Sequence, residues 1–270
     1  KKKKLKMAAR PSTLTECNHP VILHKLAHLR EKNQPPREFR RLMHELTLLV
    51  GYEASRSLDT KSVDVSTPLG DTMGKHLSQN ISIVPILRAG LGMSEAMLEI
   101  LPNAATHHIG MYRLKNSKMP VQYYNRLPKN KVADVAFVLD PIIASGITLS
   151  ATVGQLKLWG CPKIVVVSLI ATSQGAASLL AEHPDVQLFV AQASDELTEE
   201  GKAVPGLGDA GDRQFDAADT ESNPYGITMA GGDTSDSMSS MKERKRSAED
   251  MDSIPAVAST KSAGSGKKKK

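Results

Sequence analysis

The segment from Val135 to Thr148 constrains the fold of this chain more than any other stretch. It opens with five consecutive apolar residues, Val135 to Leu139, a run short and β-rich enough for a strand buried on both faces. Asp140 and Pro141 then end the strand. From Thr148 onward apolar residues recur at helical spacing, at Leu149, Val153, Leu156 and Trp159. The segment therefore predicts a strand, a tight loop and a helix in direct succession.

The loop inside this segment has the composition of an anion site. Ala144, Ser145 and Gly146 are small, so backbone N–H groups and a hydroxyl would be accessible where the helix begins. The first helical turn has unpaired N–H donors and the positive end of the dipole, both of which favour phosphate. Asp140 cannot bind a phosphate, but its carboxylate can accept hydrogen bonds from sugar hydroxyls. We interpret the loop as a ribose-phosphate cradle, with an ordinary strand–turn–helix junction as the alternative.

Apolar runs alternate with helical patterns along most of the chain. We expect helices over 20–33, 36–58, 90–101, 148–159 and 174–183, and strands over 81–87, 107–112, 135–139, 164–170 and 186–190. Residues 59–80 are expected to form a polar connection. The alternation predicts an α/β fold, with a doubly wound, mostly parallel sheet and flanking helices.

Charged side chains follow three of the expected strands. Arg88, Arg113 and Asp140 each come directly after an apolar run, and parallel sheets bind ligands at the carboxyl ends of their strands. The guanidinium group binds phosphate oxygens bidentately, so the two arginines favour an anionic ligand. Either arginine taken singly would be read as a surface charge.

The segment 113–131 is long, polar and without a strong period. Long loops in compact domains are often lids, and a lid would keep water from a transition state that resembles a ribosyl cation. The alternative is a plain surface hairpin.

Charge and composition exclude several classes of function. The formal net charge is +6, but nine lysines lie at the two ends of the chain, and without them 26 basic residues face 29 acidic ones, which leaves −3. Aromatic residues make up only 4% of the chain, too few for base-stacking platforms. We therefore expect no nucleic-acid partner. No apolar run reaches transmembrane length, so no membrane association is expected, and the two cysteines lack metal or redox spacing, which favours the reducing cytoplasm.

The chain divides into three parts by composition. Residues 1–18 form a basic N-terminal extension, residues 19–215 carry the strand and helix patterns, and residues 216–270 are expected to be a disordered tail. The cluster at 242–246 within that tail is typical both of nuclear-import signals and, more commonly, of a solvated charge run.

A glycine-rich stretch closes the patterned region. Gly206, Gly208 and Gly211 have the spacing of a dinucleotide-binding motif, but Pro205 precedes them instead of a strand, and we expect no helix after them. Three glycines with two aspartates instead indicate backbone held close to a flat ligand, whose N–H and C=O edge the peptide groups could contact. A tight acidic loop without a ligand is the alternative.

Taken together, these segments resemble the uracil phosphoribosyltransferase family from about His19 to Phe215. The Pro205–Arg213 stretch is highly specific to that family, whereas the loop at 140–148 is shared more widely among type I phosphoribosyltransferases. The other matching pieces are His19-Pro20, Val84–Met93, Gly110–Arg113, Tyr123-Tyr124 and Leu127-Pro128. The fold implied is that of the type I phosphoribosyltransferases.

The resemblance implies that phosphoribosyl pyrophosphate (PRPP) and uracil react to give UMP and pyrophosphate. It implies that Asp140 and Asp209 are catalytic, and that uracil meets Ala203, Gly208, Asp209 and Ala210. The implied PRPP-binding residues are Arg88, Arg113, Asp140, Pro141, Ile142, Ile143, Ala144, Ser145, Gly146, Ile147, Thr148 and Asp209. It also implies Mg²⁺ carried mainly by PRPP and water, GTP as an allosteric effector, and a homodimer or homotetramer.

The chain departs from the family pattern at two places. Ile142, Ile143, Ser145 and Ile147 replace the usual residues of the phosphate loop, and Lys202-Ala203 stands where the family has an aromatic residue and isoleucine. Two alternatives therefore stay open. One is a non-catalytic regulator that senses PRPP or pyrimidine nucleotides on the same fold, and the other is a phosphoribosyltransferase for another base.

Overall fold

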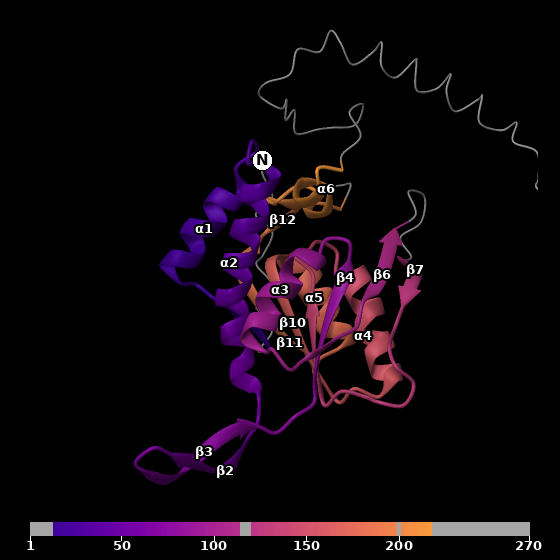
Figure 1. Ribbon diagram of the computed structural model, residues 1–270. Coiled ribbons are helices and arrows are strands. Elements are labelled where there is room, and N and C mark those ends of the chain that lie inside the picture. Colours follow the sequence, from indigo (N-terminus) through magenta and orange to yellow (C-terminus); the bar gives the residue numbers. More distant parts are fainter. Residues whose placement is uncertain (1–12, 114–119, 199–200, 218–270) are drawn as a thin grey trace, which may run out of the picture. The chain divides into compact units, whose positions relative to one another are not determined.

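The computed structural model describes residues 13–113, 120–198 and 201–217 (Figure 1). A nine-stranded sheet forms the centre of this part of the chain, with β1, β11, β10, β8, β4, β6 and β7 in spatial order, β5 beside β4 and β9 beside β10. The strands are β1 Leu14–Glu16, β4 Ile81–Leu87, β5 Ala105–Thr106, β6 Ile109–Arg113, β7 Pro120–Asn125, β8 Val135–Leu139, β9 Ile142–Ile143, β10 Lys163–Thr172 and β11 Gln187–Ser194. Every pairing is parallel except that of β6 with β7.

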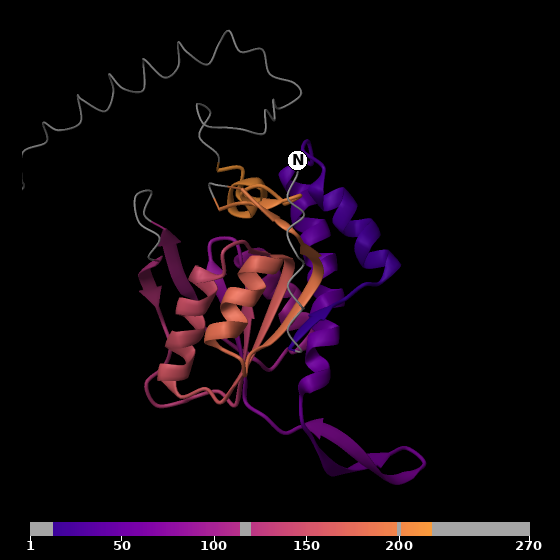
Figure 2. The same cartoon turned by 180° about the vertical axis from the view of Figure 1, so that it is seen from behind.

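Helices cover both faces of this sheet, as Figures 1 and 2 show from opposite sides. One face carries α1 Pro20–Arg30, α2 Pro36–Ala54 and α3 Leu91–Ile100, and the other carries α4 Ile147–Trp159 and α5 Ser173–Glu182. Strand β8 alternates between the two cores: Phe137 packs in the cluster beneath α2, whereas Val138 packs in the cluster beneath α4. The doubly wound, mostly parallel α/β fold predicted from the sequence is therefore confirmed.

The central elements lie close to their predicted positions, but the ends of the first two helices do not. The predicted 20–33 helix ends at Arg30, because Glu31 leaves helical geometry with ψ 127°. The predicted 36–58 helix ends at Ala54 and continues only as the 3₁₀ turn η1, Ser55–Ser57. The buried face of α2 ends at the same place, since Ala54 is the last fully buried residue of this helix.

Besides the short strands β1, β5 and β9, three features were not predicted: a hairpin, a two-stranded ribbon and a short helix. Residues 59–80, expected to be a connection, form the antiparallel hairpin β2 Thr60–Thr67 and β3 Gly70–Leu77, which extends away from the sheet in Figure 1. The two-stranded ribbon β12 Glu196–Leu197 and β13 Ala203–Val204 precedes the glycine-rich stretch. The expectation that no helix follows that stretch is wrong, because α6 spans Ala210–Phe215.

Within the segment 113–131, residues 120–125 form β7, antiparallel to β6, which matches the hairpin alternative. Residues 114–119 lie outside the described residues, as do 1–12 and 218–270, so the lid, the N-terminal extension and the tail remain predictions. No helix among the described residues is long and apolar enough to cross a membrane.

Candidate active site

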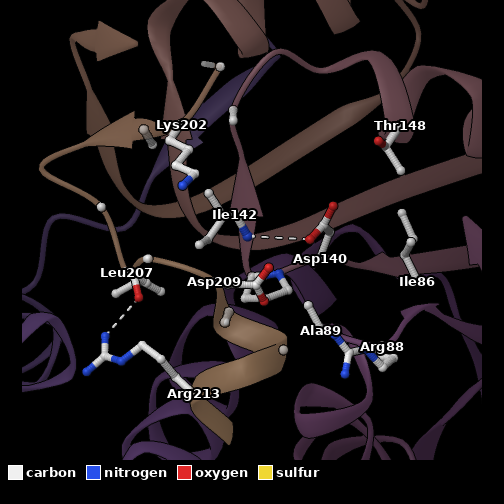
Figure 3. Close-up of a pocket in the computed structure, with 18 of the residues that line it drawn as sticks. Ile86, Arg88, Ala89, Asp140, Ile142, Thr148, Lys202, Leu207, Asp209 and Arg213 are labelled. Atoms are coloured by element: carbon white, nitrogen blue, oxygen red, sulfur yellow. Dashed lines mark hydrogen bonds between the residues drawn. The ribbon is translucent and has the colours of Figure 1, made fainter. Parts of the chain in front are cut away.

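A cavity of about 820 Å³ opens at the carboxyl ends of β4 and β8 (Figure 3). Its walls come from the turn after β4, the loop after β8, the β12–β13 ribbon and the glycine-rich stretch before α6. These segments are far apart in the sequence and meet because parallel strands place their carboxyl ends on one edge. Two predicted features, the phosphate loop and the base loop (residues 203–210), therefore face one another across one cavity.

The phosphate loop, residues 140–148, follows β8 directly. The Asp140 Oδ1 atom accepts a long hydrogen bond from the Ile142 N–H, at 3.5 Å, as an aspartate does in a turn. Gly146 has φ 77° and serves as the N-cap of α4, so the loop ends at the helix N-terminus, as predicted. Asp140, Pro141, Ile142, Ala144 and Thr148 line the cavity.

The phosphate loop packs against the N-terminus of α5. The Thr172 hydroxyl donates to the Ala144 carbonyl at 2.5 Å and accepts from the Gly175 N–H at 2.9 Å. A Cβ atom at Gly146 would lie 2.5 Å from the Gly175 carbonyl oxygen, and one at Gly175 would lie 2.2 Å from the Ala144 carbonyl oxygen. Glycine is required at both positions because two backbone segments touch there.

The remaining residues of the predicted phosphate loop lie behind the cavity surface. Ile143 is 2% exposed and packs in the core beneath α4. Ser145, Gly146 and Ile147 do not line the cavity among the described residues. Any contact of these residues with a phosphate would therefore come from the backbone N–H groups at the start of α4.

The two predicted arginines differ in what the structure describes. Arg88 follows β4 and lines the cavity, and its Nη2 donates to Asp212 Oδ1 at 3.0 Å in an ion pair that leaves the Arg88 side chain 54% exposed. Arg113 ends β6, where its backbone is in register with Pro120 of β7. The side chain of Arg113 lies outside the described residues. Of the two predicted arginines, Arg88 is therefore the one whose side chain the structure places at the cavity.

The base loop is held at both ends. On one side the Ser194 hydroxyl donates to the Val204 carbonyl at 2.7 Å. On the other, Asp209 is the N-cap of α6, and its Oδ1 accepts from the Asp212 N–H at 3.0 Å. Ala203, Gly208, Asp209 and Ala210, the predicted uracil contacts, all line the cavity.

Several cationic residues at the cavity were not predicted. Arg30, at the end of α1, donates through Nη1 to Gln192 Oε1 at 2.8 Å, and burial lowers the pKa of its guanidinium. Lys32, Lys202 and Arg213 also line the cavity. Nothing in the local sequence around Arg30 or Lys32 indicates this, because they lie more than 170 residues before the base loop that they approach.

The fold and the cavity together define a class of protein. A parallel sheet that presents a loop and helix N-terminus, several cations and two carboxylates in one cavity is an α/β protein suited to a phosphorylated sugar. Among the described residues, no group of three or more His, Cys, Asp or Glu side chains could hold a metal by itself.

Comparison with known proteins specifies the family. The family model described as uracil phosphoribosyltransferase matches residues 16–217. A uracil phosphoribosyltransferase of Dictyoglomus turgidum is 46% identical over 199 residues, which are 73% of this chain and 96% of the relative. One from Finegoldia magna is 43% identical over 205 residues, which are 76% of this chain and 98% of the relative. The chain belongs to the uracil phosphoribosyltransferase family.

A solved structure agrees with this assignment. The AQ2163 protein from Aquifex aeolicus matches with a TM-score of 0.72 and 31% sequence identity, over 76% of this chain and 99% of that chain. The region matched by the family model, residues 16–217, includes the phosphate loop and the base loop.

Proposed function

We propose that this chain transfers the phosphoribosyl group of PRPP to uracil and thereby makes UMP and pyrophosphate in pyrimidine salvage. One observation carries the proposal: in a member of this family, the phosphate loop and the base loop line a single cavity. Nitrogen N1 of uracil attacks the anomeric carbon of the ribose, the bond from that carbon to the pyrophosphate oxygen breaks, and the N1 proton is lost. The two substrates must therefore lie side by side.

Each part of the cavity has a role in this proposal. Asp140 accepts hydrogen bonds from the ribose hydroxyls, and residues 144–148 hold the 5′-phosphate at the start of α4. Arg88 and Arg113 bind the pyrophosphate, and Arg88 exchanges its ion pair with Asp212 for the ligand. The base loop binds uracil through peptide groups at Ala203 and 208–210.

Mg²⁺ fits this site as a substrate-borne ion. The carboxylates of Asp140 and Asp209 both line the cavity, and Mg²⁺ binds one or two carboxylates together with waters and phosphate oxygens. When bound, the ion would neutralise the charge that develops on the departing pyrophosphate.

The family resemblance also implies a homodimer or homotetramer, located in the cytoplasm. The β2–β3 hairpin supports self-association, since it exposes Leu69, Met73 and Leu77 on an extended ribbon. Cys17 and Cys161 are buried and unpaired, which favours a reducing compartment. GTP activation stays a prediction, and the 242–246 cluster lies outside the described residues.

A turnover assay with radiolabelled uracil, PRPP and Mg²⁺ tests the proposal, with EDTA and PRPP-free reactions as controls. We expect UMP from uracil and little product from cytosine, orotate, hypoxanthine or adenine. PRPP binding without UMP formation would support the regulator, and preferential conversion of another base would support the second alternative. The variant R88M should raise KM for PRPP more than KM for uracil.

A further inference from the structure

Arg213 is the most completely buried charged residue near the base loop. It lies in α6, its residue surface is 5% exposed, and its guanidinium carbon is 4.3 Å from the centroid of the Phe39 ring. A buried guanidinium is stable only where its N–H groups are hydrogen-bonded. Its partners therefore show what the residue holds together.

Three of those partners are backbone carbonyl oxygens, and they come from two distant segments. Arg213 Nη1 donates to Leu29 O at 3.1 Å and to Leu207 O at 2.9 Å, and Nη2 donates to Glu31 O at 2.5 Å. Leu29 and Glu31 lie at the end of α1, where helix carbonyls lack intrahelical partners and a cation is favoured. Leu207 lies in the base loop. A single side chain thus fastens the base loop to the end of α1.

This contact also sets the direction of one peptide group. The Leu207–Gly208 peptide bond is trans, so the Gly208 N–H points opposite to the Leu207 carbonyl. Figure 3 shows that carbonyl directed at the Arg213 guanidinium, on the side away from Asp140 and Thr148. The Gly208 N–H is consequently directed toward the cavity, which Gly208 lines.

Buried residues flank this peptide group and its neighbour. Leu207 is 1% exposed and Ala210 is 4% exposed, so the loop is anchored on both sides of Gly208 and Asp209. Gly208 has φ 69°, a left-handed conformation that favours glycine. It lies outside the helices and strands, so no regular hydrogen-bond pattern restrains the peptide groups on either side of it. The hydrogen bond from Arg213 to Leu207 O restrains the peptide group between residues 207 and 208.

We infer that Arg213 is a positioning residue for base recognition: by holding the Leu207 carbonyl, it directs the Gly208 N–H at a carbonyl oxygen of the pyrimidine. This inference rests on the proposed function, and it assigns Arg213, which also lines the cavity, a role that acts through the Leu207–Gly208 peptide group. The ligand that this peptide group would recognise is a neutral ring with an exocyclic carbonyl group, bound where the base loop lines the cavity.

The variant R213M tests the inference, because methionine keeps apolar contact with Phe39 and removes all the donors. We expect KM for uracil to rise about tenfold or more, the effect of losing one well-aligned hydrogen bond to the base. PRPP affinity, measured without uracil, should change less than about twofold, since the phosphate loop is separate. R213K, which keeps one donor group without the planar fork, should give an intermediate KM.

A matched control separates base positioning from general loosening of α6. Arg40 Nη1 donates to Gln214 O at 2.5 Å, so R40M removes an arginine–carbonyl contact of the same helix without touching the base loop. R40M should leave KM for uracil unchanged. An equal rise of KM in R40M and R213M would overturn the inference.

A second measurement detects the hydrogen bond itself. Inhibition constants of 2-pyrimidinone and 4-pyrimidinone, each lacking one exocyclic oxygen, are compared with the uracil affinity in wild type, R213M and R213K. We expect the variants to prefer uracil less strongly over the analogue that lacks the oxygen bound by the Gly208 N–H, because in the variants that N–H is no longer aligned with this oxygen. If R213M does not fold, R213K decides by the same comparison.

The outcomes distinguish the inference from the proposed function. Wild-type protein that makes no UMP refutes the proposed function and the inference with it. Wild-type turnover together with an unchanged uracil KM and unchanged analogue preference in a folded Arg213 variant refutes the inference alone. Loss of thermal stability at constant KM would assign Arg213 a purely structural role and also refute it.

Discussion

Asp209→Asn separates a catalytic charge from a structural hydrogen bond at one residue. Asp209 lines the cavity and also caps α6, where its Oδ1 accepts from the Asp212 N–H at 3.0 Å. Asparagine retains an acceptor oxygen in nearly the same place and is as good an N-cap as aspartate. The substitution therefore removes the negative charge and preserves the shape of the loop.

The magnitudes expected for the two roles differ enough to be told apart. Keeping the cap should limit the change in unfolding free energy to about 0.5 kcal/mol, which is a shift of about 1–2 °C in Tm for a body of this size. If the charge stabilises positive charge at the ribose carbon, kcat and kcat/KM should fall together by about 10²-fold, or about 2.7 kcal/mol. KM for uracil and PRPP should change little.

Steady-state kinetics and a thermal melt of the same sample measure both effects. Asp209→Ala is the matched control, because it removes the cap as well and should lower stability by about 1 kcal/mol more than Asp209→Asn does. Wild-type kcat in a stably folded Asp209→Asn protein would show that the carboxylate only shapes the loop, and the catalytic assignment would then be abandoned.

Three further predictions concern the loop, the buried thiol and the tail. Gly146→Ala should cost about 1–3 kcal/mol of unfolding free energy and weaken PRPP binding, because φ is 77° and the added Cβ meets the Gly175 carbonyl; a melt and a PRPP titration measure both, and an unchanged Tm would contradict the packing argument. Burial, with help from Glu53 and Glu16, raises the pKa of Cys17 to about 11 from a model-compound value of 9.0, so the unfolded state loses its thiol proton first and unfolding free energy should fall between pH 9 and pH 11. Denaturant melts of Cys17→Ala should show a weaker alkaline decline, and an identical decline would exclude this thiol as its cause. Deletion of residues 220–270 should leave kcat within about twofold of the full chain, since the family match ends at residue 217; loss of folding or of turnover would show that the tail is needed.

Local sequence determined the elements that build the sheet. The run Val135–Leu139 predicts a buried strand because five apolar residues leave no solvent face, and both faces of β8 are in fact covered by helices. The polar residues after the strands predict the position of the cavity, because parallel strands share one carboxyl edge. These properties depend on residue type and short spacing, which the sequence contains in full.

Shorter elements were missed because their signals are weak or brief. The six residues of α6 are too few for helical periodicity to be visible, although Asp209 three residues before Asp212 is a cap pattern that could have indicated it. The β2–β3 hairpin has an alternating Val63-Asp64-Val65 pattern and a turn at 67–70, which together are a weak strand signal in a segment whose polarity favours a connection.

Tertiary structure alone decided which cations reach the base loop. Arg30 lies at the end of α1, and Arg213 reaches the same helix end, where it joins carbonyls more than 170 residues apart in the chain. No local pattern specifies such a contact, because a guanidinium group can donate hydrogen bonds to any carbonyl oxygen that packing brings near. The same holds for Asp209. The sequence around it indicates an acidic loop, but Asp209 both caps a helix and lines the cavity only after α6 packs against α2. The sequence therefore determined the chemistry available at the site, and the packing of distant segments determined which groups face it.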